Sequence, residues 1–284
     1  MMYLSLVAHN KLTFPSGSAL ERYDGSYYLF GDDSPYFAIL NKTYDIKQRI
    51  ILTYDYAERI PKPFKPDWEA CTTINDNIWV FGSGSNGVIR DNILIINPVS
   101  CSFVIKEKHS IYHRLRTLAF SKEINIEAAT MVEEELWLFN RAHHSQPNHL
   151  IKCTVIGDEI DIIEIQEIPS ITYHGHILGI SGAAYDKELH ILWLTASAES
   201  TENSYDDGEI LGSVIFKSFC INGVFDILEA ERWELTNIDP KLNQQKIESI
   251  CVSDNSPNNY HLVIIADNDI GDTEIFELKV SFQE

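Results

Sequence analysis

Short apolar runs alternate with polar turns along the whole chain, and one arrangement of them recurs five times. An apolar strand opens on a small residue, and in the first four copies a second apolar strand gives way to a polar loop twelve residues later. The fifth copy has a longer turn. Repeats of roughly 50 residues that each hold several short strands are typical of a β-propeller. The small residues are Ala19, Ala70, Ala128, Ala183 and Ser249, and the second strands end at Gly31, Gly82, Asn140, Thr195 and Ala266.

Each copy contains four strand-like runs, which are rich in β-branched and aromatic residues and separated by Asn, Asp, Gly and Ser turns. Four antiparallel strands make one blade, so the sequence predicts an all-β, five-bladed propeller that forms a single domain over residues 1–284. The fifth copy ends one strand short. The unassigned run YLSLVA, residues 3–8, can supply that strand, so we expect it to close the ring against residues 273–282.

Two connectors depart from the repeat. Residues 109–124 place Ile111, Leu115, Leu118 and Ala119 at helical spacing, which predicts a helical insertion between the second and third blades. The segment ERIPKPFKP, residues 58–66, carries three prolines, and we expect it to cross the surface in an extended conformation.

The balance of charge narrows the range of partners. With 42 acidic and 22 basic residues the formal net charge is -20, which disfavours nucleic acid and anionic membranes, because both need a basic footprint. No run has the length of an apolar membrane span, and the N-terminal residues lack the basic and apolar regions of a secretory signal. We therefore expect a cytoplasmic protein. Its five cysteines form no CxxC pair and are odd in number, which argues against a disulfide framework.

Blade geometry brings two sets of polar residues to one face of the disc. The innermost strand begins and the second strand ends on the same face, because the two are antiparallel neighbours. We expect both sets to surround the mouth of the central channel. The residues before the small positions are Ser18, Glu69, Glu127, Gly182 and Glu248. The residues after the second strands include Asp32, Asp33, Ser83, Ser85, Arg141, His143, Ser197, Glu199, Asp267 and Asp269.

Three glutamates at equivalent positions of a ring direct their carboxylates at one small volume. Like charges held together raise their pKa values or recruit a cation, and carboxylate oxygens suit calcium or magnesium. The sequence thus predicts a metal site formed by Glu69, Glu127 and Glu248, with calcium as the candidate ion. The alternative is that these glutamates cap backbone N–H groups between blades and bind nothing.

Other charged residues extend this candidate site. Arg90 and Arg141 follow the second strands of blades two and three, where they can pair with the glutamates or grip a carboxylate or phosphate of a ligand. Asp32, Asp33 and Asp267 complete the candidate ligand-binding residues.

A separate hypothesis is a zinc site formed by histidines. In addition, residues 204–211 (SYDDGEIL) resemble a sialidase Asp-box with Leu in place of Trp. The histidines are His143, His144, His149, His174 and His176.

Several strings resemble those of a bacterial propeller family known as a domain of unknown function, and this resemblance covers essentially the whole chain. They are DWEACTT, LWLFNR, NIEAAT, GSGSNGVIRD, TASAESTENSYDDGEILGS and KIESICV. More distantly, the openings of the form D/N/K-x-E-small are similar to those of calcium-dependent phytase-like and esterase-like propellers, in which acidic residues line a channel-mouth site. That resemblance implies calcium, although Ser18 and Gly182 stand where a complete acidic ring needs carboxylates.

These features lead to three functional hypotheses. The first is a module that binds a divalent cation or a small polar ligand at the channel mouth. The second is a metal-assisted hydrolase of a phosphoester, ester or lactone, in which an ion polarises the substrate and a carboxylate activates water. The third is a scaffold that presents its rim to a protein partner. An ion with open positions beside a base would favour the hydrolase, whereas a closed ring of arginine and glutamate pairs leaves no room for water.

Overall fold

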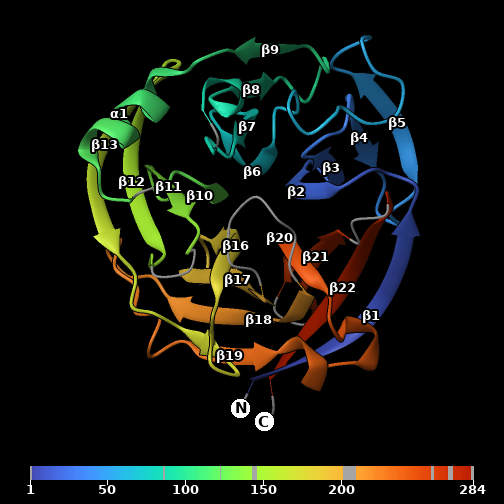
Figure 1. Ribbon diagram of the computed structural model, residues 1–284. Coiled ribbons are helices and arrows are strands. Elements are labelled where there is room, and N and C mark those ends of the chain that lie inside the picture. Colours follow the sequence, from blue (N-terminus) through green and yellow to red (C-terminus); the bar gives the residue numbers. More distant parts are fainter. Residues whose placement is uncertain are drawn as a thin grey trace.

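The computed structural model describes residues 2–85, 87–121, 123–142, 146–200, 209–256, 259–267 and 271–282. In this part of the chain, five four-stranded antiparallel sheets stand around a central axis (Figure 1). The predicted all-β, five-bladed propeller is confirmed.

The blades follow one another in chain order, and each has its first strand innermost. Blade 1 contains β2 (Gly17–Tyr23), β3 (Ser26–Gly31), β4 (Tyr36–Leu40) and β5 (Ile46–Ile51). Blade 2 contains β6 (Trp68–Ile74), β7 (Asn77–Gly82), β8 (Ile93–Ile96) and β9 (Phe103–Lys106). Blade 3 contains β10 (Ile126–Val132), β11 (Glu135–Asn140), β12 (His149–Ile156) and β13 (Glu159–Glu167). Blade 4 contains β16 (Gly179–Asp186), β17 (Ile191–Ser200), β18 (Glu209–Phe219) and β19 (Glu231–Glu234).

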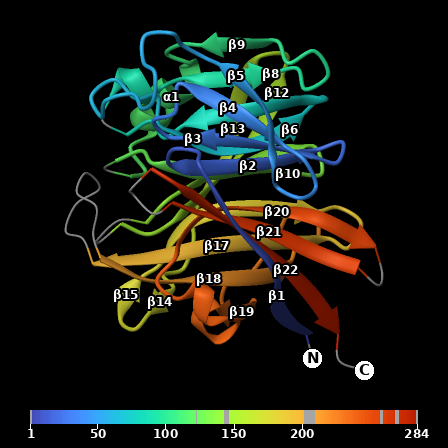
Figure 2. The ribbon, with the colours of Figure 1, turned by 90° about the vertical axis from the view of Figure 1, so that its right-hand side faces the viewer.

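Blade 5 joins the two ends of the chain. It contains β20 (Lys246–Ser256), β21 (Asn259–Asp267) and β22 (Thr273–Phe282), and β1 (Met2–Leu12) is its outer strand. Figure 2 shows β1 beside β22, with the two termini close together. The register pairs Tyr3 with Ser281 and Ala8 with Glu277, so the predicted closure by residues 3–8 is confirmed.

The two connectors differ in how well the sequence predicted them. Helix α1 (Ser110–Leu118) lies between blades 2 and 3 and buries Ile111 and Leu115, which confirms the helical insertion. The proline-rich connector is not extended, and that prediction was wrong. The backbone N–H of Phe64 donates to the carbonyl of Pro61 at 2.8 Å, which forms a turn. The 3-10 turn η1 (Val88–Arg90) lies within blade 2, and the hairpin of β14 (Thr172–Tyr173) and β15 (His176–Ile177) connects blades 3 and 4. Two further 3-10 turns, η2 (Leu235–Asn237) and η3 (Pro240–Leu242), connect blades 4 and 5.

The core lies between the blades. Five apolar clusters are present among the described residues, each formed by the facing sides of two adjacent blades. In β17, Leu192 and Leu194 pack toward blade 3, whereas Trp193 packs toward blade 5. Because both faces of each sheet are buried in this way, the second strands are continuous apolar runs rather than alternating ones.

Near the axis the inner strands lie too close together for large side chains. A Cβ atom built on Gly182 of β16 would lie 3.0 Å from backbone atoms of Ser249 and Ile250 in β20. This crowding explains the small residues that open each repeat.

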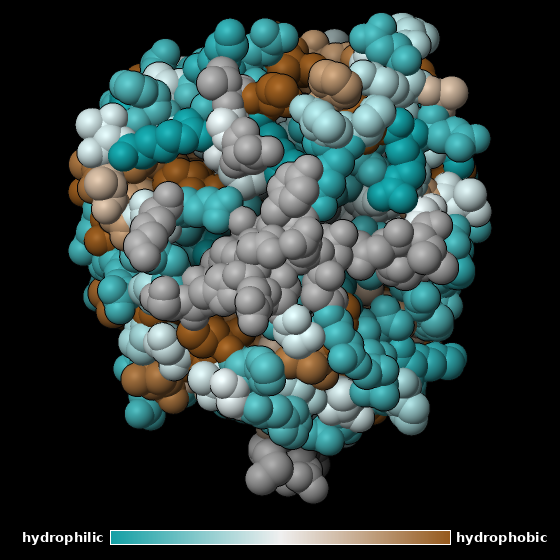
Figure 3. Space-filling model, viewed as in Figure 1, coloured by the Kyte–Doolittle hydropathy of each residue, from teal (hydrophilic) through white to brown (hydrophobic). Residues whose placement is uncertain are grey.

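On the face seen in Figure 3, hydrophilic residues form most of the rim, with smaller hydrophobic patches between them. Among the described residues, no helix has the length and apolar character needed to cross a lipid bilayer.

Candidate functional site

Each inner strand carries a β-bulge near its start, and the bulge determines which side chain reaches the channel. The strand register shifts at Glu69 in β6, at Glu127 in β10 and at Glu248 in β20. In blades 1 and 4 the same shift falls on Ser18 and Ser181. A bulge inserts one residue and re-aims its side chain, so these residues leave the alternation that directs their neighbours toward adjacent blades.

Gly182 was predicted to occupy this position in blade 4, and that prediction was wrong by one residue. Pairing shifts between Ile180 and Gly182, so Ser181 is the bulged residue. Its hydroxyl donates to the carbonyl oxygen of Ile247, just before the bulge of blade 5. Ser18 likewise donates to the carbonyl oxygen of Trp68, just before the bulge of blade 2. The two serines therefore link neighbouring blades.

A cavity of about 110 Å³ lies at the mouth of the channel and is called the mouth cavity below. Six of the eight sequence-predicted ligand residues line it, together with Lys65, Asp67, Asn125 and Lys246 among others. The remaining two do not. Arg141 lies beside the cavity and binds its glutamates, and Asp33 binds Arg59, whose Nε donates to Oδ2 at 2.7 Å. The six are Glu69, Glu127, Glu248, Arg90, Asp32 and Asp267.

One side of the mouth cavity is a closed network of ion pairs around Arg141. The guanidinium lies 3.2 Å from Glu127, 2.6 Å from Glu199 and 4.0 Å from Glu248. Lys246 adds contacts of 3.0 Å to Glu248 and 3.5 Å to Glu199. Burial opposes ionisation of Glu199, but Arg141 and Lys246 outweigh it and lower its pKa. Of the two roles predicted for Arg141, the structure thus shows the pairing with glutamates.

On the other side, a second set of ion pairs surrounds Asp67. Arg90 Nη1 lies 2.6 Å from Asp67 Oδ2 and also donates to Ser85 Oγ at 2.6 Å. Lys65 Nζ lies 2.7 Å from Asp67 Oδ1 and contacts Asp32 Oδ2 as well. Arg90 therefore binds an aspartate rather than one of the bulged glutamates.

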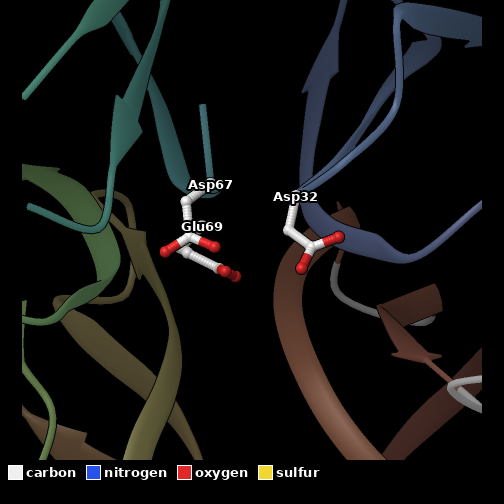
Figure 4. A group of neighbouring side chains, drawn as sticks. All are labelled: Asp32, Asp67 and Glu69. Atoms are coloured by element: carbon white, nitrogen blue, oxygen red, sulfur yellow. The ribbon is translucent and has the colours of Figure 1, made fainter. Parts of the chain in front are cut away.

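Glu69 differs from the other two glutamates because it forms neither a hydrogen bond nor an ion pair with any residue that the structure describes. Burial raises its pKa well above the usual range, and the negative charges of Asp67, Glu127 and Asp32 add to the effect. Figure 4 shows Asp67 and Glu69 together, with Asp32 facing them. Ligand oxygens of the three lie within 4.8 Å of one another. Asp32 Oδ1 is buried and has no hydrogen-bond partner.

The charges of these two sides do not balance. Arg141, Lys246, Arg90 and Lys65 are four cations, and they face six carboxylates. The surplus is therefore two negative charges if every group is ionised. The carboxylates are Asp32, Asp67, Glu69, Glu127, Glu199 and Glu248.

Sequence reasoning missed a set of residues that lie two positions before the bulged glutamates. Asp67, Asn125 and Lys246 all line the mouth cavity, and the Asn125 side chain donates to Glu127 Oε1 at 2.7 Å. They are the first residues of the D/N/K-x-E-small openings, so the signal was present in the motif. Lys65 had no such signal, because the turn that begins at Pro61 brings it to the site.

The zinc hypothesis finds no support in the described part of the chain. His174 and His176 are exposed on the β14–β15 hairpin, and His149 is buried with its ring edge against Phe120. No histidine there belongs to a group whose ligand atoms are close enough to hold a metal. His143, His144, Asp269 and residues 204–208 of the Asp-box string lie outside the described residues.

The stability of the fold should depend on pH through Glu248. Burial raises its pKa from the ordinary 4.5 to about 7, and Glu127 contributes while Lys246 opposes the shift. The folded state then binds more protons than the unfolded chain, so the free energy of unfolding falls as the pH rises from about 5 to about 8. We expect urea titrations to show this decline, and a smaller decline for Glu248→Gln. Parallel profiles for the two proteins would contradict the assignment.

Comparison with curated proteins found no match. Among solved structures, glutaminyl cyclase from Myxococcus xanthus is similar in fold, with a TM-score of 0.54 and 8% identity over 98% of this chain and 97% of that one. A streptogramin B lyase has a TM-score of 0.43 at 12% identity over 99% of this chain and 98% of that one. Virginiamycin B lyase from Staphylococcus aureus has a TM-score of 0.42 at 12% identity over 100% of both chains.

At these identities the structural similarities describe the fold and not the chemistry. Sequence comparison is more specific, because residues 13–280 match a family of unknown function (DUF6929). That match includes all five inner strands and the residues of the mouth cavity. This five-bladed propeller therefore belongs to the DUF6929 family.

Proposed function

We propose that the mouth cavity binds a hard divalent cation such as calcium, with Glu69 as its central ligand. The observation that carries the proposal is the state of Glu69, which lines the cavity without a hydrogen bond or ion pair to any described residue. Glu69 is partly buried, and a carboxylate that has lost much of its contact with water is costly unless a proton or a cation neutralises it. The six carboxylates outnumber the four basic groups by two, and a doubly charged cation would neutralise this excess.

The oxygen atoms that remain available suit such an ion. Lys65 contacts Asp32 Oδ2 and Asp67 Oδ1, and Arg90 takes Asp67 Oδ2. This leaves the buried Oδ1 of Asp32 and both carboxylate oxygens of Glu69. Calcium takes about six to eight oxygen ligands, and water can complete a set that begins with these three. Asp67 would then stabilise the ion mainly through its charge.

Calcium should raise the melting temperature of the protein. A ligand that binds only the folded state stabilises it by about 2.7 kcal/mol at a hundredfold excess over its Kd. We expect thermal melts with calcium, magnesium and manganese to show this shift for at least one ion, and Glu69→Gln to abolish it. If none of the three ions moves the wild-type melt, the mouth cavity is not a cation site.

A second variant separates the two possible ligand sets. The sequence-predicted site uses Glu69, Glu127 and Glu248 together, whereas the geometry favours Glu69 with Asp32 and Asp67. Glu127→Gln should therefore keep most of the calcium response, because Arg141 and Asn125 already bind Glu127. Asp32→Asn should lose it. The exposed Glu134 offers a control, since Glu134→Gln removes a charge far from any described ion pair of the cavity.

Metal-assisted hydrolysis of a phosphoester, ester or lactone is the second candidate. It is favoured by one observation, which is that the raised pKa of Glu69 suits a general acid or base. Against it, Arg141 binds Glu127 and Glu248, so the cavity offers few carboxylates to activate water beside an ion. An assay of phosphate esters, carboxylate esters and lactones with and without calcium tests this candidate, and activity that Glu69→Gln abolishes would support it.

A further inference from the structure

A second cavity of about 200 Å³ lies on the same axis as the mouth cavity. Every residue that lines it belongs to one of the five inner strands, β2, β6, β10, β16 and β20. These residues lie two to four positions after the bulged residues, further along each inner strand. Along β6, Glu69 and Thr72 are three residues apart, which corresponds to about 10 Å. The second cavity is therefore a separate chamber at the opposite end of the channel.

Glu21 is the one carboxylic acid among the described residues that line the second cavity. Thr73 Oγ1 donates to its Oε1 at 3.0 Å. Its other oxygen forms no hydrogen bond or ion pair with any described residue, although Arg22 is next in the chain and also lines the cavity. Burial raises the pKa of Glu21 to about 8. A cationic partner that replaced the proton would therefore be bound with a favourable charge interaction.

The rest of the lining combines polar and hydrocarbon surface. Met131, Ala184, Ile250 and Val252 contribute hydrocarbon surface, and Thr72, Thr73 and Thr130 add hydroxyl groups. An engineered apolar cavity of about 150 Å³ is large enough for benzene, so this one has room for a ligand of similar or slightly larger size. A single acid beside hydroxyl groups and a smaller hydrocarbon surface suits a small molecule with one positive group and a short apolar part.

We propose that the second cavity binds a small primary amine, whose ammonium group pairs with Glu21 and whose hydrocarbon part packs against Met131 and Ile250. The other titratable groups near Glu21 or in the cavity lining are the exposed Arg22 on β2, Cys71 on β6, Tyr185 on β16 and Cys251 on β20. Burial raises the pKa of both thiols, so they stay neutral and do not compete for the amine. The site is independent of cation binding at the mouth cavity.

Thermal melts and calorimetry with n-butylamine test this proposal, and 1-butanol serves as the uncharged probe of the same size. At pH 8.5 we expect the amine to raise the melting temperature and the alcohol to have little effect. Because Glu21 must lose its proton to pair with an ammonium group, binding should release protons at pH 7, and affinity should rise between pH 6 and about 8.5. An equal response to the alcohol would overturn the proposal.

Two variants make the assignment specific. Glu21→Gln keeps the hydrogen-bond acceptor for Thr73 but removes the charge. It should lower the affinity for n-butylamine by about tenfold or more. Ala184→Leu narrows the cavity from another strand and should also weaken binding. Glu69→Gln should leave the amine response unchanged, just as Glu21→Gln should leave any calcium response unchanged. An amine response that survives both Glu21→Gln and Ala184→Leu would refute the second site. The absence of any response of the wild-type protein at the highest soluble amine concentration would refute it as well.

Discussion

Replacing Arg141 by methionine should lower the free energy of unfolding by about 3–5 kcal/mol at pH 7, because breaking a buried ion pair leaves uncompensated charge behind. The side chain of Arg141 is 11% exposed, and its guanidinium contacts three carboxylates. Without it, Lys246 alone would face Glu199 and Glu248, and Glu127 would keep only the hydrogen bond from Asn125. Chemical denaturation in urea at constant pH measures the loss.

A matched control uses an arginine that contacts two carboxylates at the surface. The side chain of Arg114 is 39% exposed and lies near Asp161 and Glu159. Arg114→Met should cost less than about 1 kcal/mol, because exposed ion pairs contribute little. A similar loss for both variants would show that the network at the channel mouth is not a major source of stability.

Acid should partly rescue the Arg141→Met variant. Protonation neutralises the carboxylates that the substitution leaves unpaired, so its deficit relative to the wild type should shrink as the pH falls from 7 to about 5. Adding Glu199→Gln to Arg141→Met should have the same effect, since Glu199 makes the shortest contact with the guanidinium. A deficit that is unchanged by either treatment would assign the loss to packing rather than to charge.

Removing residues 1–10 should destabilise the propeller by about 5 kcal/mol or more, which is a large part of the stability of a typical domain. The deletion removes most of β1 and leaves β22 as an unpaired edge, which favours aggregation as well as unfolding. It also uncovers the core of blade 5, where Met2 and Leu4 are buried. Solubility and the melting temperature by circular dichroism measure the effect.

Point substitutions in β1 separate packing from strand pairing. Leu4→Ala should cost about 2–5 kcal/mol, as expected for a buried leucine. Val7 is 48% exposed, so Val7→Ala should change stability by less than about 0.5 kcal/mol. A truncated protein that melts like the intact one would mean that the ring is closed in another way.

Local sequence patterns were sufficient to predict the blades. Four strand-like runs per repeat, and the continuous apolar character of the second strands, follow directly from burial of both faces of each sheet. The missing fourth strand of the last repeat identified residues 3–8 as the closing strand. The helical spacing of Ile111 and Leu115 likewise identified α1. Each of these features depends on neighbours in the chain or on a count of strands, and both can be read from sequence.

The site required the tertiary structure, because its charges come from segments that are far apart in the chain. Sequence spacing placed Glu69, Glu127 and Glu248 at one mouth, and the β-bulges confirm that these positions are equivalent. It did not reveal that Arg141 binds two of them, or that Glu69 has no ion-pair partner in the part of the chain that the structure describes. Those outcomes depend on which cation reaches which carboxylate across blades, as Lys65 does from a proline turn that local preference predicted to be extended. Repeat spacing is therefore enough to predict the architecture and the carboxylates at the channel mouth, whereas the way their charges are neutralised depends on contacts between blades.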